Sequence, residues 1–308
     1  MNKDTILVVG SANMDMVVQV DHFPKPGETI LGRDFGMFPG GKGANQAVCC
    51  AKLNYHTCFM GKMGEDVFHQ RLSQSMQEDG VDLRYLLIDS HESTGVALIS
   101  VDQTGENQII VASGTNMQLT PRDVEAQRKA FEEAKAVLTQ LEIPLKTVLR
   151  TAELAREYHT RFILNPAPAQ PLPDELFGLC DFITPNETEL EILTGKSTND
   201  PDSIEIAAKM LLAKGVKNVI VTLGAEGALW VSASESRRFS TKKVQAVDST
   251  AAGDAFNGAF VAALAGEKDI PQAIQSANRV ATFTVTKRGA QTSMPTLFEV
   301  EQFYKDVP

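Results

Sequence analysis

The segment from Asp248 to Asp254 contains the residues of this chain that could most directly do chemistry. Its small residues Ala251, Ala252 and Gly253 precede a helix-like run, so their backbone N–H groups would be exposed at a helix start, where an anion can bind. Asp254 would then lie at the mouth of an anion site, which is a repulsive arrangement. The arrangement is useful if the carboxylate takes a proton from a hydroxyl group that attacks a bound phosphoryl group. The alternative is an acid that only complements the helix dipole.

A glycine-rich segment, residues 36–46, precedes a second helix-like run. It nearly fits the spacing of a nucleotide-binding P-loop, but Gly43 stands where that loop needs a Ser or Thr to ligate magnesium. We therefore exclude a P-loop. The glycines, among them Gly41, allow the backbone to approach a ligand closely, and Asn45 would lie in the first turn of the helix. The alternative is a turn that only leads into the helix.

Two further segments place polar residues at predicted strand ends. Asn186 and Glu189 would share one face of a first helical turn, where they could hold hydrated magnesium. The same two residues also fit a capping box, in which the asparagine caps the helix and the glutamate bonds back to it. A glycine turn from Thr222 to Gly227 follows a strand of the buried type. It would lie at the carboxyl edge of a sheet, where open parallel sheets bind ligands.

Strand-like and helix-like segments alternate through most of the chain. Strands are predicted at 5–10, 56–61, 136–141, 161–164, 181–184, 218–223 and 227–231, and helices at 43–53, 65–79, 253–266 and 271–285. Thr120-Pro121 and Asp200-Pro201 each combine a capping residue with a first-turn proline and so predict two more helix starts. The alternation predicts an α/β fold with a mostly parallel central sheet and helices on both faces.

Two β-like insertions interrupt this alternation, at residues 16–38 and 94–112. The second is predicted to be a hairpin that turns at residues 102–107. We expect both insertions to form one small sheet that projects from a main α/β domain composed of residues 1–15, 39–93 and 113–308. The insertions are too short to bury both faces of a sheet, yet many of their residues are apolar. One face would therefore need cover, such as a second copy of the chain.

Net charge and composition exclude several classes of function. The chain has 29 Lys and Arg against 39 Asp and Glu, a formal net charge of −10, which disfavours binding to nucleic acid or to an anionic membrane. It has no run of 18 apolar residues and no signal peptide, so we expect a cytoplasmic protein without a membrane span. The four cysteines have neither CxxC spacing nor an accompanying histidine pair and are predicted to be buried, reduced thiols.

Taken together and in this order, the motifs resemble those of the ribokinase-like (PfkB-type) carbohydrate kinases. The resemblance extends over nearly the whole chain and rests on GSANMD at 10–15, GGKGANQAV at 40–48, STGVALI at 93–99, NPAPA at 165–169, TPNETE at 184–189, TLG at 222–224, VQAVDSTAAGDAFNGA at 244–259 and RGAQ at 288–291. In one departure, the commoner family form of the anion site reads DTxGAGD, whereas Ser249, Ala251 and Ala252 stand here. Alanine keeps the N–H donors, so the same chemistry is expected.

The resemblance implies a role for each motif. Asp254 would be the general base that also contacts the sugar, and the N–H groups of Ala251, Ala252, Gly253 and Asp254 would stabilise the transferred phosphoryl group. The sugar hydroxyl groups would be held by Asn13, Asp15, Gly41, Lys42, Gly43, Asn45 and Glu142. The ATP cleft would be lined by Asn186, Thr222, Gly224, Ala225, Glu226, Gly227, Gly253 and Asn278, with Glu189 near magnesium. A monovalent cation would be held by Asp248 and Ser293 and by the backbone carbonyl groups of Thr250, Thr284, Lys287 and Gly289.

The implied reaction is ATP-dependent phosphorylation of D-ribose at its 5-hydroxyl group, with Mg²⁺ and a K⁺ activator. The resemblance also implies a homodimer joined through the two insertions, which would close over the sugar as a lid. Kinases of deoxyribose, fructose, a ketodeoxy acid or a nucleoside are alternatives within the class. A non-catalytic sugar sensor on the same fold is disfavoured by the intact Asp254 and anion site. A Rossmann dehydrogenase is disfavoured because GSANMD, and not GxGxxG, follows the first strand.

Overall fold

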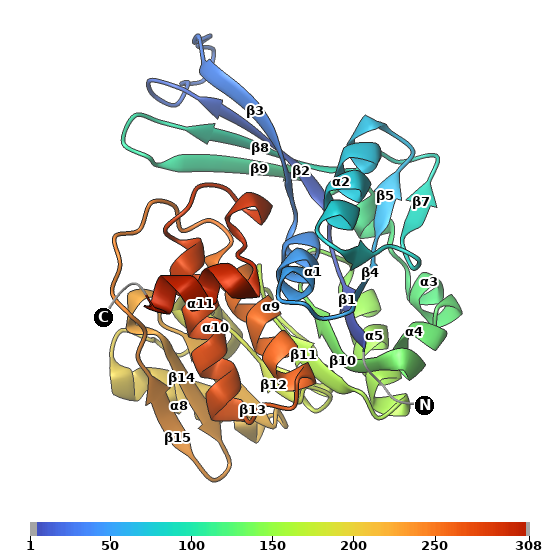
Figure 1. The fold of residues 1–308 in the computed structure, drawn as a ribbon, viewed down its shortest axis with the longest axis vertical. Helices are drawn as coiled ribbons and strands as arrows, with labels where there is room; N and C mark the ends of the chain where they lie inside the picture. Colours follow the sequence, from blue (N-terminus) through green and yellow to red (C-terminus); the bar gives the residue numbers. More distant parts are fainter. Residues whose placement is uncertain (1–4, 306–308) are drawn as a thin grey trace.

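A nine-stranded sheet forms the centre of the computed structural model, which describes residues 5–305 (Figure 1). The strand order is β15–β14–β13–β12–β11–β10–β1–β4–β6, and all neighbours from β13 to β6 are parallel. The last two strands are antiparallel because the short turn at Gly224–Glu226 allows no crossover between β13 and β14. The strands are β1 (Thr5–Val9), β4 (Thr57–Met60), β6 (Val81–Asp82), β10 (Ala134–Thr139), β11 (Arg161–Leu164), β12 (Phe182–Ile183), β13 (Asn218–Thr222), β14 (Ala228–Ser232) and β15 (Ser236–Phe239).

Helices cover both faces of this sheet, and the alternation of side chains along the strands explains why. In β1, Ile6 and Val8 belong to one buried cluster and Leu7 and Val9 to the other. The first cluster involves α1 (Lys42–Lys52), α2 (Val67–Glu78), α9 (Ala252–Ala265), α10 (Ile270–Thr284) and α11 (Leu297–Lys305). The second involves α3 (Pro121–Ala126), α4 (Lys129–Glu133), α5 (Leu145–Glu157), α6 (Asp174–Phe177), α7 (Glu187–Thr194) and α8 (Pro201–Ala213). The predicted α/β fold is confirmed.

The predicted helix starts are present in the structure. Thr120 caps α3 and Asp200 caps α8, each in a capping box followed by a proline in the first turn. The carboxylate of Asp66 accepts two N–H groups of α2, so this helix begins at Val67. The chain leaves α2 through Gly80 at φ 88°, a conformation that glycine adopts without strain.

A second sheet projects from the main body at the upper left of Figure 1. Its order is β3–β2–β8–β9, with β2 and β8 parallel and the other two pairs antiparallel. The strands are β2 (Asn13–Gln19), β3 (Arg33–Gly40), β8 (Gly95–Val101) and β9 (Asn107–Ala112), the last two forming the predicted hairpin. The motif GSANMD follows β1 as expected, but its residues Asn13 and Asp15 already belong to β2 of this second sheet. The division of the chain into a main domain and a lid stays a prediction.

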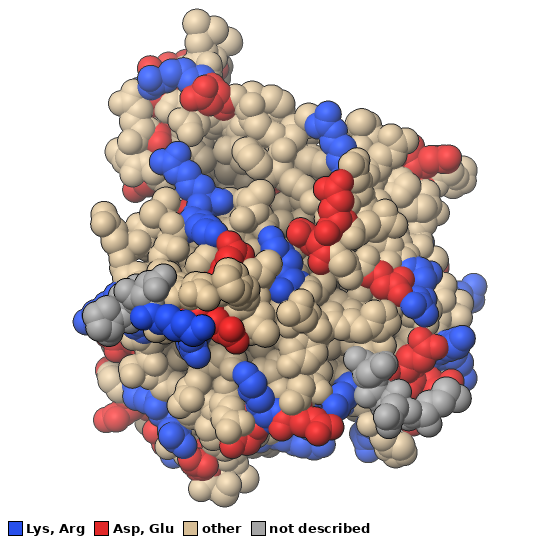
Figure 2. All heavy atoms as spheres, viewed as in Figure 1, with Lys and Arg blue, Asp and Glu red and all other residues tan. Residues whose placement is uncertain are grey.

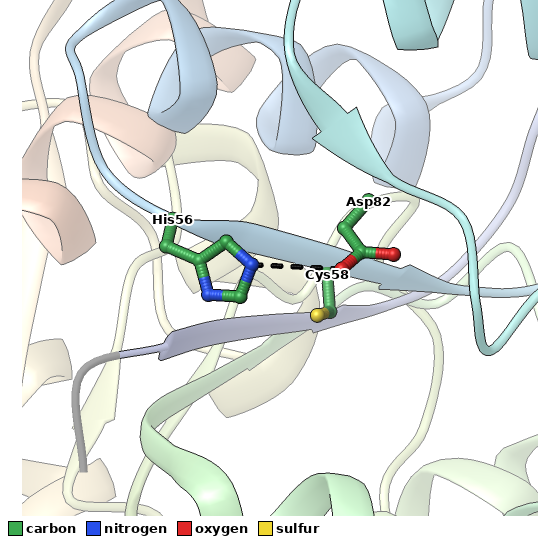
Figure 3. A group of neighbouring side chains, drawn as sticks. All are labelled: His56, Cys58 and Asp82. Carbon is green, nitrogen blue, oxygen red and sulfur yellow. Dashed lines mark ion pairs between the residues drawn. The ribbon is translucent and has the colours of Figure 1, made fainter. Parts of the chain in front are cut away.

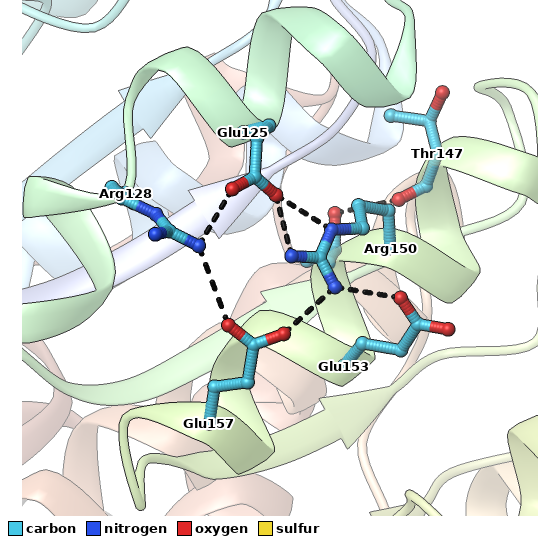
Figure 4. A network of polar contacts seen from close by, with 7 residues as sticks. Glu125, Arg128, Thr147, Arg150, Glu153 and Glu157 are labelled. Atoms are coloured by element: carbon cyan, nitrogen blue, oxygen red, sulfur yellow. Dashed lines mark hydrogen bonds and ion pairs between the residues drawn. The ribbon is translucent and has the colours of Figure 1, made fainter.

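Two helices on the outer surface, α3 and α5, are joined by a network of ion pairs (Figure 4). Arg150 donates to Glu125 at 2.5 and 2.7 Å, to Glu153 at 2.7 Å and to Glu157 at 2.9 Å. Arg128 lies 2.6 Å from Glu125 and 3.4 Å from Glu157. Every carboxylate of this network therefore has a guanidinium partner.

The surface charges and the cysteines can be compared with the expectations drawn from the composition of the chain. Basic and acidic side chains are interspersed on the face shown in Figure 2. Among residues 5–305, no helix has the length and apolar character needed to cross a membrane. All four cysteines are buried and free of disulfide bonds, as predicted. The expected cytoplasmic location stays a prediction.

Candidate active site

The predicted site residues converge at the carboxyl edge of the central sheet. The segments 10–12, 140–142, 165–168, 184–186 and 223–227 directly follow β1, β10, β11, β12 and β13. Helices α1 and α9 contact each other, and both begin close to this edge (Figure 1). Ligand sites of open parallel sheets lie at such an edge, where loops are free to differ while the strands hold them in place.

Asp254 lies in the first turn of α9 and is only 6 % exposed. Its carboxylate accepts two hydrogen bonds from α1. Asn45 Nδ2 donates to Oδ2 at 2.9 Å, and Gln46 Nε2 donates to Oδ1 at 2.9 Å. Because both donors are neutral amides, they orient the carboxylate without placing a positive charge against it.

The start of α9 has some of the features of an anion site. Ala251 caps the helix in the left-handed conformation, with φ 59° and ψ 11°, and offers no side-chain cap. The Ala252 N–H group donates to the Ser249 carbonyl group at 3.2 Å, so this expected anion donor is already engaged. A cavity of about 240 Å³ opens at Gly253 and Asp254, where a Cβ at Gly253 would meet only open space. Its lining also includes Lys42, Asn165, Asn186 and Glu189.

Asn13 and Asp15 reach the site from β2 because glycines on the neighbouring strands leave room for them. Asn13 Oδ1 accepts a hydrogen bond from Asn116 Nδ2 at 2.7 Å, and a Cβ at Gly95 would overlap both amides. A Cβ at Gly40 would overlap the Asp15 carboxylate. The close approach of β3 and β8 to these polar groups therefore requires glycine.

Glu142 links the end of β10 to the start of α1. Its Oε2 atom accepts the Ser11 hydroxyl group at 2.5 Å and the Lys42 backbone N–H group at 3.1 Å. Gly41 precedes the helix at φ 89°, and a Cβ there would overlap the backbone of Ala12. The glycine-rich turn thus positions α1 against β2, and it is not a simple connector.

Negative charge dominates the electrostatics of the site. Burial, followed by the charges of Glu142 and Asp254, raises the pKa of Asp15 to about 7. Burial also raises the pKa of Glu189 above its usual value. Burial lowers the pKa of Lys42, but the carboxylates of Asp254, Glu142 and Glu189 outweigh it and hold this pKa above its ordinary value. Such a site favours ligands that bring hydroxyl donors or cations.

Asn186 and Glu189 form the capping box that the sequence allowed. Asn186 Oδ1 accepts the Glu189 N–H group at 2.8 Å, and Glu189 Oε2 accepts the Asn186 N–H group at 2.9 Å. Both residues also line the 240 Å³ cavity. Capping therefore holds their oxygen atoms at the cavity wall, and the magnesium role of the same pair stays a prediction.

A larger cleft of about 630 Å³ adjoins this cavity and shares Asn186, Thr222 and Gly253 with it. The residues expected at the nucleotide that line this cleft are Asn186, Thr222, Gly224, Ala225, Gly227, Gly253 and Asn278, whereas Glu226 does not line it. The segment 241–246 contributes lining residues for which the sequence provided no expectation. The cleft and the cavity together form a continuous path past the start of α9.

The residues expected at a monovalent cation come from two loops that the structure brings together. Asp248 Oδ1 accepts the Thr250 N–H group and Asp248 Oδ2 accepts the Gly289 N–H group, both at 2.9 Å. The N–H groups of residues 247 and 248 both donate to the Val285 carbonyl group, at 2.7 and 3.2 Å. Thr284 and Ser293 are fully buried. The loop before α9 is thus tied to residues 284–293.

Several buried polar residues at this edge were not singled out as site residues from the sequence, among them Gln46, Asn116, Gln140 and Asn165. Gln46 and Asn165 lie in the motifs GGKGANQAV and NPAPA, which were the available signal. Asn116 and Gln140 lie outside every motif. Asn116 orients Asn13, and Gln46 donates to Asn165 at 3.0 Å, so these residues hold other site residues in place.

A separate group with metal-ligand chemistry lies at the amino end of β4 and on β6, where His56, Cys58 and Asp82 offer ligand atoms within 4.8 Å of one another (Figure 3). The Asp82 carboxylate accepts Arg84 Nε at 2.7 Å, lies 2.5 Å from Arg84 Nη2 and lies 3.5 Å from His56 Nε2. Burial, with the charge of Asp82, raises the pKa of Cys58 to about 12. A protonated thiol and a carboxylate engaged by a guanidinium group describe an ion pair and not a metal centre.

A cavity of about 790 Å³ at the amino edge of the sheet is rich in cations. Lys217 lies 2.6 Å from Asp181, and Lys135 lies 2.9 Å from Glu267. Arg161 donates to a carbonyl group in the last turn of α9 at 3.3 Å. These cations form ion pairs and complement helix ends, as expected where helix C-termini gather.

Comparison with known proteins agrees with this geometry. A family model described as pfkB family carbohydrate kinase matches residues 3–297. The chain is 42% identical to a ribokinase of Haemophilus influenzae over 98% of both chains, and 38% identical to a deoxyribokinase of Salmonella typhi over 97% of both. The structure of Arabidopsis thaliana ribokinase complexed with ribose and ATP superposes with a TM-score of 0.93, at 35% identity over 99% of both chains. The chain therefore belongs to the pfkB family of carbohydrate kinases.

Proposed function

We propose that this protein transfers the γ-phosphoryl group of ATP to the 5-hydroxyl group of D-ribose, giving D-ribose 5-phosphate and ADP. Similarity to ribokinases over nearly the full length supports this reaction, as does the similarity to a ribokinase complexed with ribose and ATP. The observation that carries the proposal is the place of Asp254. It is buried at a helix start, lies close enough to Asp15 to affect its pKa, and lines the 240 Å³ cavity that adjoins the 630 Å³ cleft.

Asp254 acts as the general base in this proposal. Its carboxylate accepts the proton of the 5-hydroxyl group as that oxygen attacks the γ-phosphorus atom, and the bond from phosphorus to the ADP oxygen breaks. The N–H groups of Gly253 and Asp254, at the positive end of the α9 dipole, stabilise the charge on the phosphoryl oxygens. Lys42 lines the same cavity and adds a positive charge.

The sugar is held by the polar cluster on the opposite side of Asp254. Carboxylates and amides of Asn13, Asp15, Asn45 and Glu142 bind hydroxyl groups, because each can accept the hydrogen bonds that a polyol donates. The backbone of Gly41 and Gly43 and the side chain of Lys42 complete the wall. The second sheet, β3–β2–β8–β9, closes over the bound sugar and excludes water.

Magnesium suits the residues around the smaller cavity. The Glu189 carboxylate and the Asn186 amide line this cavity, and both offer oxygen atoms, the ligand type that Mg²⁺ prefers, directly or through water. Bound together with ATP, the ion supplies positive charge to the phosphate oxygens.

Potassium suits the two loops joined at Asp248. Asp248, Ser293 and the carbonyl groups of residues 250, 284, 287 and 289 form an all-oxygen donor set, and carbonyl oxygens are the usual protein ligands of K⁺. A cation there would order the loop that leads into α9 and offset local negative charge. We expect kcat to be higher in KCl than in NaCl or Tris, and Asp248→Ala to remove the difference. Equal rates of the wild type in all three salts would contradict the site.

A homodimer is proposed through the outer face of the second sheet. The strand register pairs Leu98 with Ile110 and places both on the face opposite Asp15, and they are 49% and 68% exposed. Phe35 on β3, 65% exposed, extends this apolar surface. A second copy that presents the same face would cover it by a two-fold interface.

The dimer is tested by light scattering at micromolar concentration. We expect a mass of twice 33.5 kDa for the wild type, and a monomer with weaker sugar binding for Leu98→Asp/Ile110→Asp. The matched control is Ile192→Asp, a half-exposed apolar residue on α7, which should leave the mass unchanged. A wild-type mass of 33.5 kDa contradicts the proposal.

A kinase of 2-deoxyribose is the second candidate, because the Salmonella typhi deoxyribokinase is 38% identical to this chain. A coupled ADP-release assay over pentoses, hexoses, their deoxy forms and nucleosides distinguishes the two. We expect the highest kcat/KM with D-ribose. A higher value with 2-deoxyribose would transfer the assignment to that sugar, and no ADP release with any sugar would contradict the proposed function.

A further inference from the structure

A chain of buried amides leads from Asp254 to the end of β10. Gln46 Nε2 donates to Asp254 Oδ1 at 2.9 Å, and Gln140 Nε2 donates to Gln46 Oε1 at 2.5 Å. Gln46 Nε2 also donates to Asn165 Oδ1 at 3.0 Å. Both glutamines are 0% exposed. The chain therefore connects the carboxylate on α9, through α1, to the residue that follows β10.

The carboxylate fixes the direction of each hydrogen bond in this chain. An ionised carboxylate only accepts, so Gln46 must turn its NH₂ group toward Asp254 and its oxygen away. Gln140 must then present its own NH₂ group to Gln46. As a result Gln140 Oε1 is buried with no hydrogen-bond partner among residues 5–305. A buried acceptor without a partner costs stability, so the arrangement has a cost that packing alone does not explain.

The fold makes room for this costly arrangement. Gly10 directly follows β1, the neighbour of β10, and a Cβ at Gly10 would overlap Gln140 Oε1. The opposite carboxylate oxygen, Asp254 Oδ2, accepts Asn45 Nδ2. The carboxylate is therefore held at both oxygens from α1, and Gln46 in turn bonds to Asn165 and Gln140 at the edge of the central sheet.

We infer that Gln46 and Gln140 are positioning residues for phosphoryl transfer, which hold the Asp254 carboxylate aimed at the sugar hydroxyl group. Gln46 acts through its hydrogen bond to Asp254, and Gln140 acts through Gln46. The inference rests on the proposed role of Asp254 as the general base. The reaction slows when the base is no longer aligned with the hydroxyl group, because proton transfer requires a defined geometry.

The test replaces each glutamine by methionine, which keeps the length of the side chain and removes the donor. For Gln46→Met we expect kcat to fall about 10- to 100-fold while KM for ATP and ribose changes less than about threefold. Gln140→Met should lower kcat by a smaller factor, again with little change in either KM. The kcat of the double variant should equal that of Gln46→Met alone, since Gln140 acts only through Gln46.

Two controls make the outcomes distinct. Thr147 is buried and donates to the Leu119 carbonyl group at 2.6 Å, so Thr147→Val should lower the melting temperature and leave kcat and both KM values unchanged. Asp254→Asn tests the base itself, and wild-type turnover in that variant contradicts the proposed function. If Asp254→Asn is inactive but Gln46→Met keeps the wild-type kcat, only the positioning role fails. If Gln46→Met does not fold, Gln140→Met decides by the same outcomes.

Discussion

Two clusters of charged side chains in this protein are arranged in opposite ways. On the surface between α3 and α5, the carboxylates of Glu125, Glu153 and Glu157 all bond to guanidinium groups (Figure 4). At the carboxyl edge of the sheet, Glu142 and Asp254 bond only to amide, hydroxyl and backbone donors in the contacts described above. The pKa of Asp15 rises to about 7, mainly because the residue is buried and further because the charges of Glu142 and Asp254 lie close by.

The difference separates a cluster in which every charge is paired from one that leaves oxygen atoms available, as the proposed function requires. Ion pairs at a surface contribute about 0–1 kcal/mol each, and every partner is satisfied without a ligand. Carboxylates that are buried near one another oppose folding, but their oxygen atoms stay available for hydroxyl groups, protons and cations. Perturbed acids in a cleft are for this reason typical of active sites.

The largest effect is expected at the buried cluster. Asp254→Asn keeps the shape and removes the basic oxygen, so kcat should fall about 10²- to 10⁴-fold while ATP and ribose still bind. Steady-state kinetics measures the change in kcat, and calorimetric titration measures the binding of ATP and ribose. The matched control is Glu125→Gln in the surface network, which should keep the wild-type kcat. Near-normal turnover in Asp254→Asn would remove Asp254 as the base.

The pH dependence of stability gives the next largest effect. The pKa of Asp15 rises from 3.8 to about 7 on folding, so between these values the unfolded chain releases a proton that the folded chain keeps. Stability of the ligand-free protein is therefore lost as pH rises through this window, by up to about 4 kcal/mol from this group. Asp15→Asn should remove that loss.

The measurement is urea unfolding of wild type and Asp15→Asn at pH 5 and pH 8. The variant should gain stability relative to the wild type at pH 8 and gain much less at pH 5. The same variant should bind ribose more weakly, because a hydroxyl acceptor is lost. A constant difference between the two proteins at both pH values would show that Asp15 does not titrate in this range.

The surface network should respond weakly and in a salt-dependent way. Glu125→Gln removes the ion pairs to Arg128 and Arg150 and should lower the free energy of unfolding by about 0.5–1 kcal/mol at low salt. The loss should shrink in 1 M NaCl, because salt screens exposed charges. Thermal unfolding in the two buffers checks this. A loss that is independent of salt would mean that Glu125 contributes through packing.

The smallest effect is expected at Ala251, beside the buried cluster. Its φ of 59° favours glycine, which the commoner family motif has there. Ala251→Gly should relieve about 1 kcal/mol of strain, offset by the greater freedom of glycine in the unfolded chain. We expect a net change in stability below about 1 kcal/mol and kcat within about threefold of the wild type. A large loss of activity would indicate that the alanine methyl group has a role in the site.

The sequence by itself determined the elements and the chemically important segments. Helix starts at Thr120 and Asp200 were predictable because a cap and a first-turn proline act locally. The hairpin of residues 94–112 and the alternation of strands and helices were predictable because side-chain periodicity reports which face is buried. Asp254 was identifiable as a site residue from the small residues that precede it.

Only the tertiary structure decided how these segments meet. Asn45 and Gln46 bond to Asp254 across 209 and 208 positions of sequence, which requires α1 to pack against α9. Gln140 joins them only because β10 lies beside β1 in the strand order. The left-handed conformation of Ala251 could not be predicted from the sequence either, since alanine has no preference for it. Local propensity describes neighbours in sequence, whereas these contacts depend on the order of strands and the packing of helices, which no local pattern contains.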